Sequence, residues 1–264
     1  MSEHLVVEHD GPILRLRLAR PEKRNALDDD MLDGLLDAVT DGAGDDQLRA
    51  VLLSAEGDHF CGGADLISRN QPRDERPRTG SVQRRVANQA HRLIPALLSV
   101  QLPVVAAVRG WAVGIGLHLA LAADFAVVAD DARMAEPFVD RGFTPDSGAT
   151  WLVPRLIGMA RAKEMLLLGK EVSGARAAEW GLVHRAVPAD DVESAAEELT
   201  EALAMGPTVA LGLTKWLLHA GSGIPLEQHL ANEGLSLELS ARSPDFREGI
   251  TALREKRPPH FEGR

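Results

Sequence analysis

Short apolar runs and amphipathic stretches alternate along the first two thirds of the chain. Continuous apolar runs at 50–55 and 104–108 predict buried strands. At 13–18 leucines alternate with arginines, which predicts a strand with one buried side and one side facing water. The Asp10-Gly11 pair that precedes this strand predicts a hairpin turn.

Other stretches have helical spacing. One apolar helix side is predicted at Met31, Leu32, Leu35, Leu36 and Val39, with Asp28 or Asp29 as its N-cap. Residues 82–100 predict one long helix that Pro95 kinks. Two further helices are expected at 150–157 and 160–168, separated near Gly158.

The order of these elements predicts an α/β fold. Strand and helix alternate through roughly the first 190 residues, which favours right-handed βαβ units. Only helices are expected afterwards, at 208–220, 226–242 and 244–256. We therefore expect a core at 1–204 and a helical region at 205–264.

Composition narrows the class of protein. The chain has 264 residues, of which 45% are apolar, so it can bury a substantial core. A net charge of −10 argues against nucleic acid or an anionic membrane as the main partner. No stretch approaches the ~20 apolar residues of a membrane span. We expect a cytoplasmic protein with a polar, mobile loop at 68–80.

Two glycine-rich turns each follow a predicted buried strand. Gly114 and Gly116 follow the strand at 104–108, and the Gly62-Gly63 turn follows the strand at 50–55. A helix that begins on such a turn presents free N–H groups to a negative oxygen. Either turn alone is also an ordinary tight turn, but together they can supply two donors to one oxygen. Cys61 in the first turn is either a small packing residue or a catalytic thiol.

The two turns also carry a family resemblance. The motif F-C-G-G-A-D-L at 60–66, paired with G-W-A-V-G-I-G-L-H-L-A-L-A-A-D at 110–124, resembles the crotonase superfamily of enoyl-CoA hydratases and isomerases. The resemblance implies a spiral of ββα repeats, an acyl-CoA thioester substrate and no cofactor, since coenzyme A is part of the substrate. It also implies that the C-terminal helices assemble a homo-oligomer, a trimer or a dimer of trimers.

The resemblance assigns roles to individual residues. It places two oxyanion-binding N–H groups at Ala64 and Ile115. It implies that the acyl-CoA contacts Lys23, Arg24, Ala26, Gly62, Ala64, Asp65, Leu66, Gly114, Phe138, Phe246 and Lys256. The alternative for Lys23 and Arg24 is a solvated basic loop. Phe246 and Lys256 can equally be ordinary residues of an amphipathic helix.

The hydratase acid–base pair is missing from the matching positions. The family's two glutamates align with His118 and Phe138, and Glu136 stands two positions away from the second. His118 then has three readings: a hydrogen-bonded core or pocket histidine, a second acid or base, or a metal ligand. No second ligand stands at a useful spacing from it, so no metal site is expected.

A different carboxylate remains in the P-D-S-G segment at 145–148. In the isomerases of the family, including the ring-epoxide isomerase of phenylacetyl-CoA breakdown, the aspartate of this segment is the base. This implies that Asp146 is the acid/base of an isomerase; the alternative is that it caps the next helix. Such a base works best where an apolar site raises its pKa, and Phe138 is expected to make the site apolar. A hydratase that uses His118 and a catalytically weak acyl-CoA-binding protein remain the functional alternatives.

Overall fold

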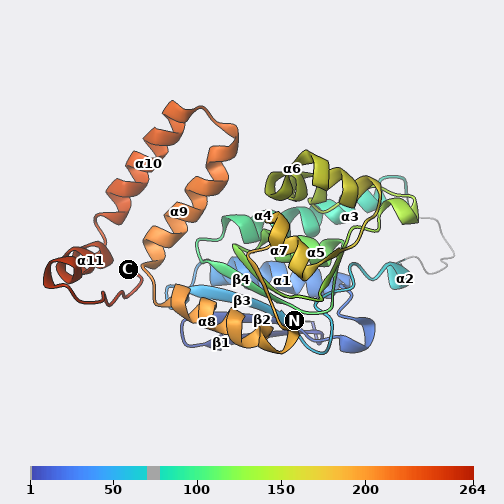
Figure 1. Cartoon of the computed structure of the whole chain (residues 1–264), viewed down its shortest axis with the longest axis horizontal. Coiled ribbons are helices and arrows are strands. Elements are labelled where there is room, and N and C mark those ends of the chain that lie inside the picture. The colour runs from blue at the N-terminus through green and yellow to red at the C-terminus, as the bar shows by residue number, and fades with distance from the viewer. Residues whose placement is uncertain (1, 70–77) are drawn as a thin grey trace.

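Two β-sheets with helices packed around them form the body of the molecule (Figure 1). The computed structural model describes residues 2–69 and 78–264. The strands are β1 (Leu5–Asp10), β2 (Ile13–Leu18), β3 (Ala50–Ala55), β4 (Val104–Val108), β5 (Trp111–Val113), β6 (Phe125–Ala129), β7 (Arg133–Ala135), β8 (Val172–Ser173) and β9 (Arg185–Val187). Of the loop predicted at 68–80, residues 70–77 lie outside the described residues, so its mobility stays a prediction.

The larger sheet has the order β1-β2-β3-β4-β6-β9. Strands β1 and β2 form the predicted antiparallel hairpin, in which Asp10 pairs with Ile13 across a turn where Gly11 has a φ of 54°. The other neighbours in this sheet are parallel, as the βαβ pattern predicts. Strand β4 is buried along its whole length.

The chain repeatedly leaves the larger sheet for the smaller one. After β4 it enters β5 and then a helix, and after β6 it enters β7, which pairs with β5 in the smaller sheet of order β5-β7-β8. A single β-bridge between Cys61 and Ala112 ties the loop after β3 to the same small sheet. This is the predicted spiral of strand, strand and helix.

The helices confirm most of the predicted pattern. They are α1 (Asp29–Gly42), α2 (Leu66–Arg69), α3 (Ser81–Asn88), α4 (Ala90–Ser99), α5 (Ile115–Ala122), α6 (Ala149–Leu167), α7 (Gly174–Trp180), α8 (Val192–Ala204), α9 (Thr208–Ala220), α10 (Leu226–Ser240) and α11 (Pro244–Glu255). Four short 3-10 helices are η1 (Pro21–Lys23), η2 (Val139–Arg141), η3 (Ala189–Asp191) and η4 (Gly221–Gly223). Asp28 caps α1, because its Oδ1 accepts the N–H of Met31 at 2.8 Å.

The predicted single helix at 82–100 is wrong. The chain breaks at Gln89, whose φ of −116° and ψ of −91° end α3, while Pro95 lies inside α4. The break separates a surface helix from a core helix: α3 has no buried residue, whereas α4 buries Leu93, Ile94 and Leu97. By contrast, Gly158 interrupts α6 as predicted, with a φ of 74° and a ψ of 165°.

From Thr208 to Glu255 every element is a helix, and α10 and α11 extend away from the sheets (Figure 1). Helix α9 is attached to the core through Lys215, whose ammonium lies 2.7 Å from Asp124 Oδ2. The same ammonium donates to the carbonyl oxygens of Leu97 at 2.9 Å and Leu102 at 3.2 Å. Within the described ranges, no helix combines the length and the apolar character needed to cross a bilayer.

Candidate active site

The two glycine-rich turns lie against each other. The N–H of Cys61 donates to the carbonyl of Trp111 at 2.8 Å, and the N–H of Val113 donates to the carbonyl of Cys61 at 3.0 Å. Cys61 packs so closely against Gly116 in α5 that position 116 has no space for a side chain. A Cβ there would lie 2.5 Å from Cys61 Cβ. Burial raises the pKa of the Cys61 thiol to about 12, so a thiolate nucleophile is not available there.

Each of the two predicted donor N–H groups follows a glycine with a positive φ angle. Gly63 has a φ of 99° and Gly114 a φ of 53°, and each precedes a predicted oxyanion donor, Ala64 or Ile115. In the described part of the chain neither of these N–H groups donates a hydrogen bond to another residue. Helix α5 begins at Ile115, so this N–H belongs to its unpaired first turn.

Both donors line a narrow cavity of about 50 Å³, here called the inner cavity. Its lining includes Ala64, Leu66, Arg85, Gly114, Ile115, Phe138, Arg141 and Asp146. Five residues predicted for the oxyanion turns and the acyl contact therefore meet there, together with Asp146. The two arginines were not foreseen, because nothing in the sequence connects α3 with η2.

Asp146 reaches the inner cavity from the loop before α6. The N-cap of α6 is Gly148, with a φ of 106° and no side-chain capping bond, so Asp146 does not cap this helix. Its Oδ1 accepts a hydrogen bond from Ser147 Oγ at 3.2 Å, and His91 Nε2 lies 2.7 Å from its backbone carbonyl oxygen. The expected desolvated surroundings are not found, because Asp146 is exposed at the rim of the cavity.

The buried carboxyl is instead Glu136, which forms a pair with His118. Both side chains are fully buried, and Glu136 Oε1 lies 2.9 Å from His118 Nε2. Burial raises the pKa of Glu136, although the nearby His118 opposes part of the rise. Phe138 lines the inner cavity, and His118 does not. The Phe138 ring lies nearly parallel to the His118 imidazole, with 6.2 Å between the ring centroids.

A wider hollow of about 340 Å³, here called the outer groove, continues from the inner cavity. Val113, Pro137 and Arg141 line both spaces. Lys23, Arg24 and Gly62 line the outer groove, and the side chains of Lys23 and Arg24 are exposed and form no ion pair with the described residues. These two cations are available to an anionic group, such as a phosphate, at the mouth of the cavity.

The remaining predicted contact residues lie elsewhere. Ala26 lines neither space, and the Asp65 carboxylate is turned to Arg20, whose Nη1 lies 2.9 Å from Asp65 Oδ2. Phe246 and Lys256 belong to α11 and its end, on the opposite side of the molecule from α2 and α3 (Figure 1). One chain alone therefore does not bring Phe246 and Lys256 to the inner cavity.

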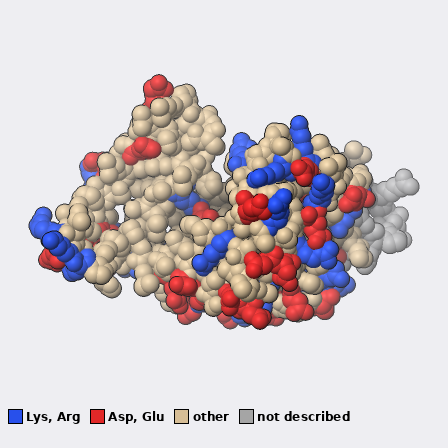
Figure 2. Space-filling view, viewed as in Figure 1, with Lys and Arg blue, Asp and Glu red and all other residues tan. Residues whose placement is uncertain are grey.

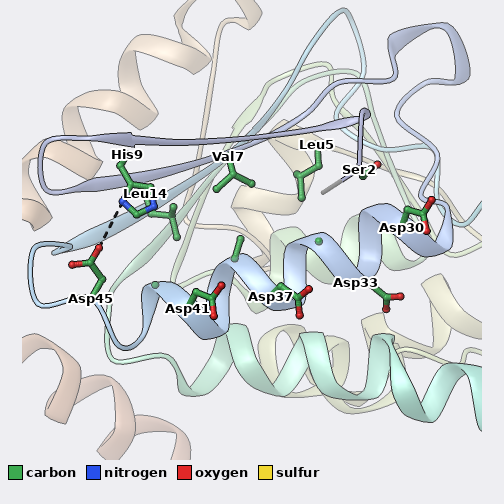
Figure 3. A pocket seen from close by; sticks show the side chains of 13 residues that line it. Ser2, Leu5, Val7, His9, Leu14, Asp30, Asp33, Asp37, Asp41 and Asp45 are labelled. Atoms are coloured by element: carbon green, nitrogen blue, oxygen red, sulfur yellow. Dashed lines mark ion pairs between the residues drawn. The ribbon is translucent and has the colours of Figure 1, made fainter.

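A third hollow, of about 670 Å³, lies between β1 and α1 (Figure 3). Its lining is acidic: Asp30, Asp33, Asp37, Asp41 and Asp45. It contains none of the predicted site residues, and its charge repels a polyphosphate such as that of coenzyme A. Among the described residues, no three His, Cys, Asp or Glu side chains are grouped as metal ligands.

Comparison with known proteins identifies the family of the chain. Residues 8–264 match the family model for enoyl-CoA hydratase/isomerase. The chain is 36% identical over 265 residues to 1,2-epoxyphenylacetyl-CoA isomerase of Escherichia coli (strain K12), and 39% identical over 265 residues to a probable enoyl-CoA hydratase of Rhodobacter capsulatus; each match covers 100% of both chains. The crystal structure of an enoyl-CoA hydratase from Bacillus anthracis superimposes with a TM-score of 0.91 at 30% identity, covering 99% of this chain and 100% of that one. The chain therefore belongs to the enoyl-CoA hydratase/isomerase family, the crotonase superfamily.

Proposed function

We propose that the protein moves the double bond of an enoyl-CoA, with Asp146 as the acid/base. The observation that carries this proposal is the lining of the inner cavity. Asp146 is the one carboxylate among the described residues of that lining, and it shares the space with the two unpaired N–H groups. A single carboxylate suffices for isomerisation, since it can remove a proton from one carbon and return it to another.

The residues suggest how the reaction proceeds. The N–H groups of Ala64 and Ile115 hold the thioester oxygen, and Lys23 and Arg24 bind phosphates of the coenzyme. Asp146 takes a proton from C2 of a 3-enoyl thioester, and the electron pair moves onto the thioester oxygen as an enolate. When the enolate collapses, the double bond shifts to C2–C3 and C4 takes the proton from Asp146. Each oxyanion donor contributes about 3–4 kcal/mol to lowering the barrier.

Hydration is the alternative, and the name of the Rhodobacter relative keeps it open. Water addition in this family needs a second acid or base in contact with the substrate. The candidates His118 and Glu136 are fully buried and do not line the inner cavity. The burial of these two residues favours isomerisation over hydration, and the name of the Escherichia coli relative, an isomerase, supports isomerisation as well.

The test supplies the wild-type protein with a 3-enoyl-CoA and, separately, with a 2-enoyl-CoA. The products are separated by chromatography, which distinguishes the double-bond isomers, and then weighed by mass spectrometry, which detects added water. We expect the 3-enoyl substrate to become its 2-enoyl isomer without a change of mass, and little gain of water by the 2-enoyl substrate. Efficient hydration that survives Asp146→Asn and is lost in His118→Ala would replace the proposal with the hydratase alternative. Tight binding with no turnover of either substrate would show a binding protein.

A further inference from the structure

A chain of three hydrogen bonds runs through the core behind Asp146. Glu136 Oε1 lies 2.9 Å from His118 Nε2, and His118 Nδ1 lies 2.8 Å from Ser147 Oγ. Ser147 Oγ lies 3.2 Å from Asp146 Oδ1, which completes the chain. Glu136 and His118 are 0% exposed and Ser147 is 2% exposed, and none of the three lines the inner cavity. Their contacts with one another end at the proposed acid/base.

We propose that Glu136, His118 and Ser147 are positioning residues: they hold the Asp146 carboxylate through the Ser147 hydroxyl only while the Glu136–His118 pair keeps a proton. This inference rests on the proposed role of Asp146. It adds three residues to the site and a dependence on pH that Asp146 alone does not have.

The argument follows from the single proton of the Ser147 hydroxyl. If that proton points to Asp146, Ser147 Oγ must accept from His118, so Nδ1 carries a hydrogen. Nε2 then either accepts from a protonated Glu136 or carries a second hydrogen opposite a Glu136 carboxylate. In both arrangements the pair holds one shared proton. When one proton is lost, the Glu136 carboxylate favours the tautomer of neutral His118 that carries its hydrogen on Nε2, so this hydrogen shifts from Nδ1 to Nε2. Nδ1 then accepts a hydrogen bond from the Ser147 hydroxyl. Asp146 is then left without this donor.

The environment favours the state that holds the proton. Glu136 Oε2 is buried and has no hydrogen-bond partner in the described part of the chain, so an uncompensated carboxylate there is costly. Burial raises the pKa of Glu136; His118 opposes part of the rise, and the negative charge of Asp146 adds to it.

Other titratable groups lie near these hydrogen bonds: His91 and His219 line a hollow together with Ser147. The neutral ring of Phe138 covers His118 on the side of the inner cavity. His91 lies on the backbone carbonyl of Asp146, and Arg85 and Arg141 share the cavity wall with the Asp146 carboxylate. His91, Arg85 and Arg141 act on Asp146 directly. A substitution at Ser147 leaves these three contacts in place, so its effect on Asp146 can be measured separately.

The first test measures kcat and KM against pH for wild type and Ser147→Ala, using whichever enoyl-CoA reaction the wild type performs. We expect kcat to fall roughly ten- to hundredfold, because a hydrogen bond to a charged group is lost, with little change in KM. The acid limb of the kcat profile should move to higher pH, since the lost bond favoured the charged carboxylate. Ser147→Thr keeps the hydroxyl, so its acid limb should lie at the same pH as that of the wild type. An acid limb that stays in place in Ser147→Ala overturns the proposal.

The matched control is Ser194→Ala, which removes an exposed hydroxyl that donates to the carbonyl of Asp191. Glu136→Gln gives an independent second test: the amide can donate to His118 Nε2 but has no proton to lose. The alkaline fall of kcat expected in wild type should then be absent. A wild type without an alkaline limb, or a limb unchanged in Glu136→Gln, overturns the proton dependence. Absence of isomerisation by wild type counts instead against the proposed function.

Discussion

At the scale of single residues, the proposed site combines two backbone N–H groups with the carboxylate of Asp146. The N–H groups of Ala64 and Ile115 have no acceptor within the described chain, and both residues line the cavity that Asp146 also lines. Leaving a buried N–H unpaired costs free energy, so such a pair indicates a place reserved for a ligand oxygen. The identity of these two side chains matters little for this role, which explains how an isoleucine can occupy the second position.

The oxyanion role of Ala64 predicts a sharp difference between two substitutions. Ala64→Pro removes the N–H and should lower kcat by about 10²–10³-fold, while Ala64→Gly keeps the N–H and should remain near wild type. The measurement is kcat on an enoyl-CoA substrate, with circular dichroism to show that both variants fold. Near-normal turnover by folded Ala64→Pro contradicts the assignment.

At the scale of elements, the sequence predicts the turns that form the site but not the contacts between distant segments. Gly63 and Gly114 mark their turns because they adopt positive φ angles, and the apolar runs before them mark β3 and β4. The Glu136–His118 pair carries no sequence signal, because its members are 18 positions apart and come from different elements. The sequence predicts one helix across Gln89 and not the break. The break depends on tertiary packing, which buries residues of α4 but none of α3.

The attachment of α9 to the core also depends on a contact between distant segments. Lys215→Met leaves the Asp124 carboxylate without its cation and two carbonyl groups without a donor, so the free energy of unfolding should fall by about 3–5 kcal/mol. The control is Lys170→Met, which removes an exposed pair with Glu164 at 3.5 Å and should cost less than about 1 kcal/mol. Chemical denaturation at one protein concentration measures both, and equal effects would argue against this attachment.

At the scale of the whole molecule, charge and apolar surface are unevenly distributed. On the face in Figure 2, acidic and basic side chains are frequent over the sheets and their helices, and few cover α9 and α10. Leucines there are more than half exposed: Leu218, Leu226, Leu230, Leu235, Leu237 and Leu239. So much apolar surface on a projecting helical region indicates contact with other chains.

We therefore expect a homo-oligomer, a trimer or a dimer of trimers, in which other copies cover these leucines. Leu237→Glu should weaken the assembly, because it places a charge among apolar contacts. Glu227→Gln, on the same helix, removes a charge and should leave the assembly intact. Sedimentation at micromolar concentration measures the mass, and a monomeric wild type contradicts the expectation.

The central claim is that Asp146 moves the proton, and the most direct measurement is the rate at which Asp146→Asn converts a 3-enoyl-CoA into its 2-enoyl isomer. The substitution keeps the size of the side chain and removes its basicity. We predict a loss of at least about 10²–10⁴-fold in kcat relative to wild type, with folding and substrate binding retained. A rate near that of wild type would contradict the account.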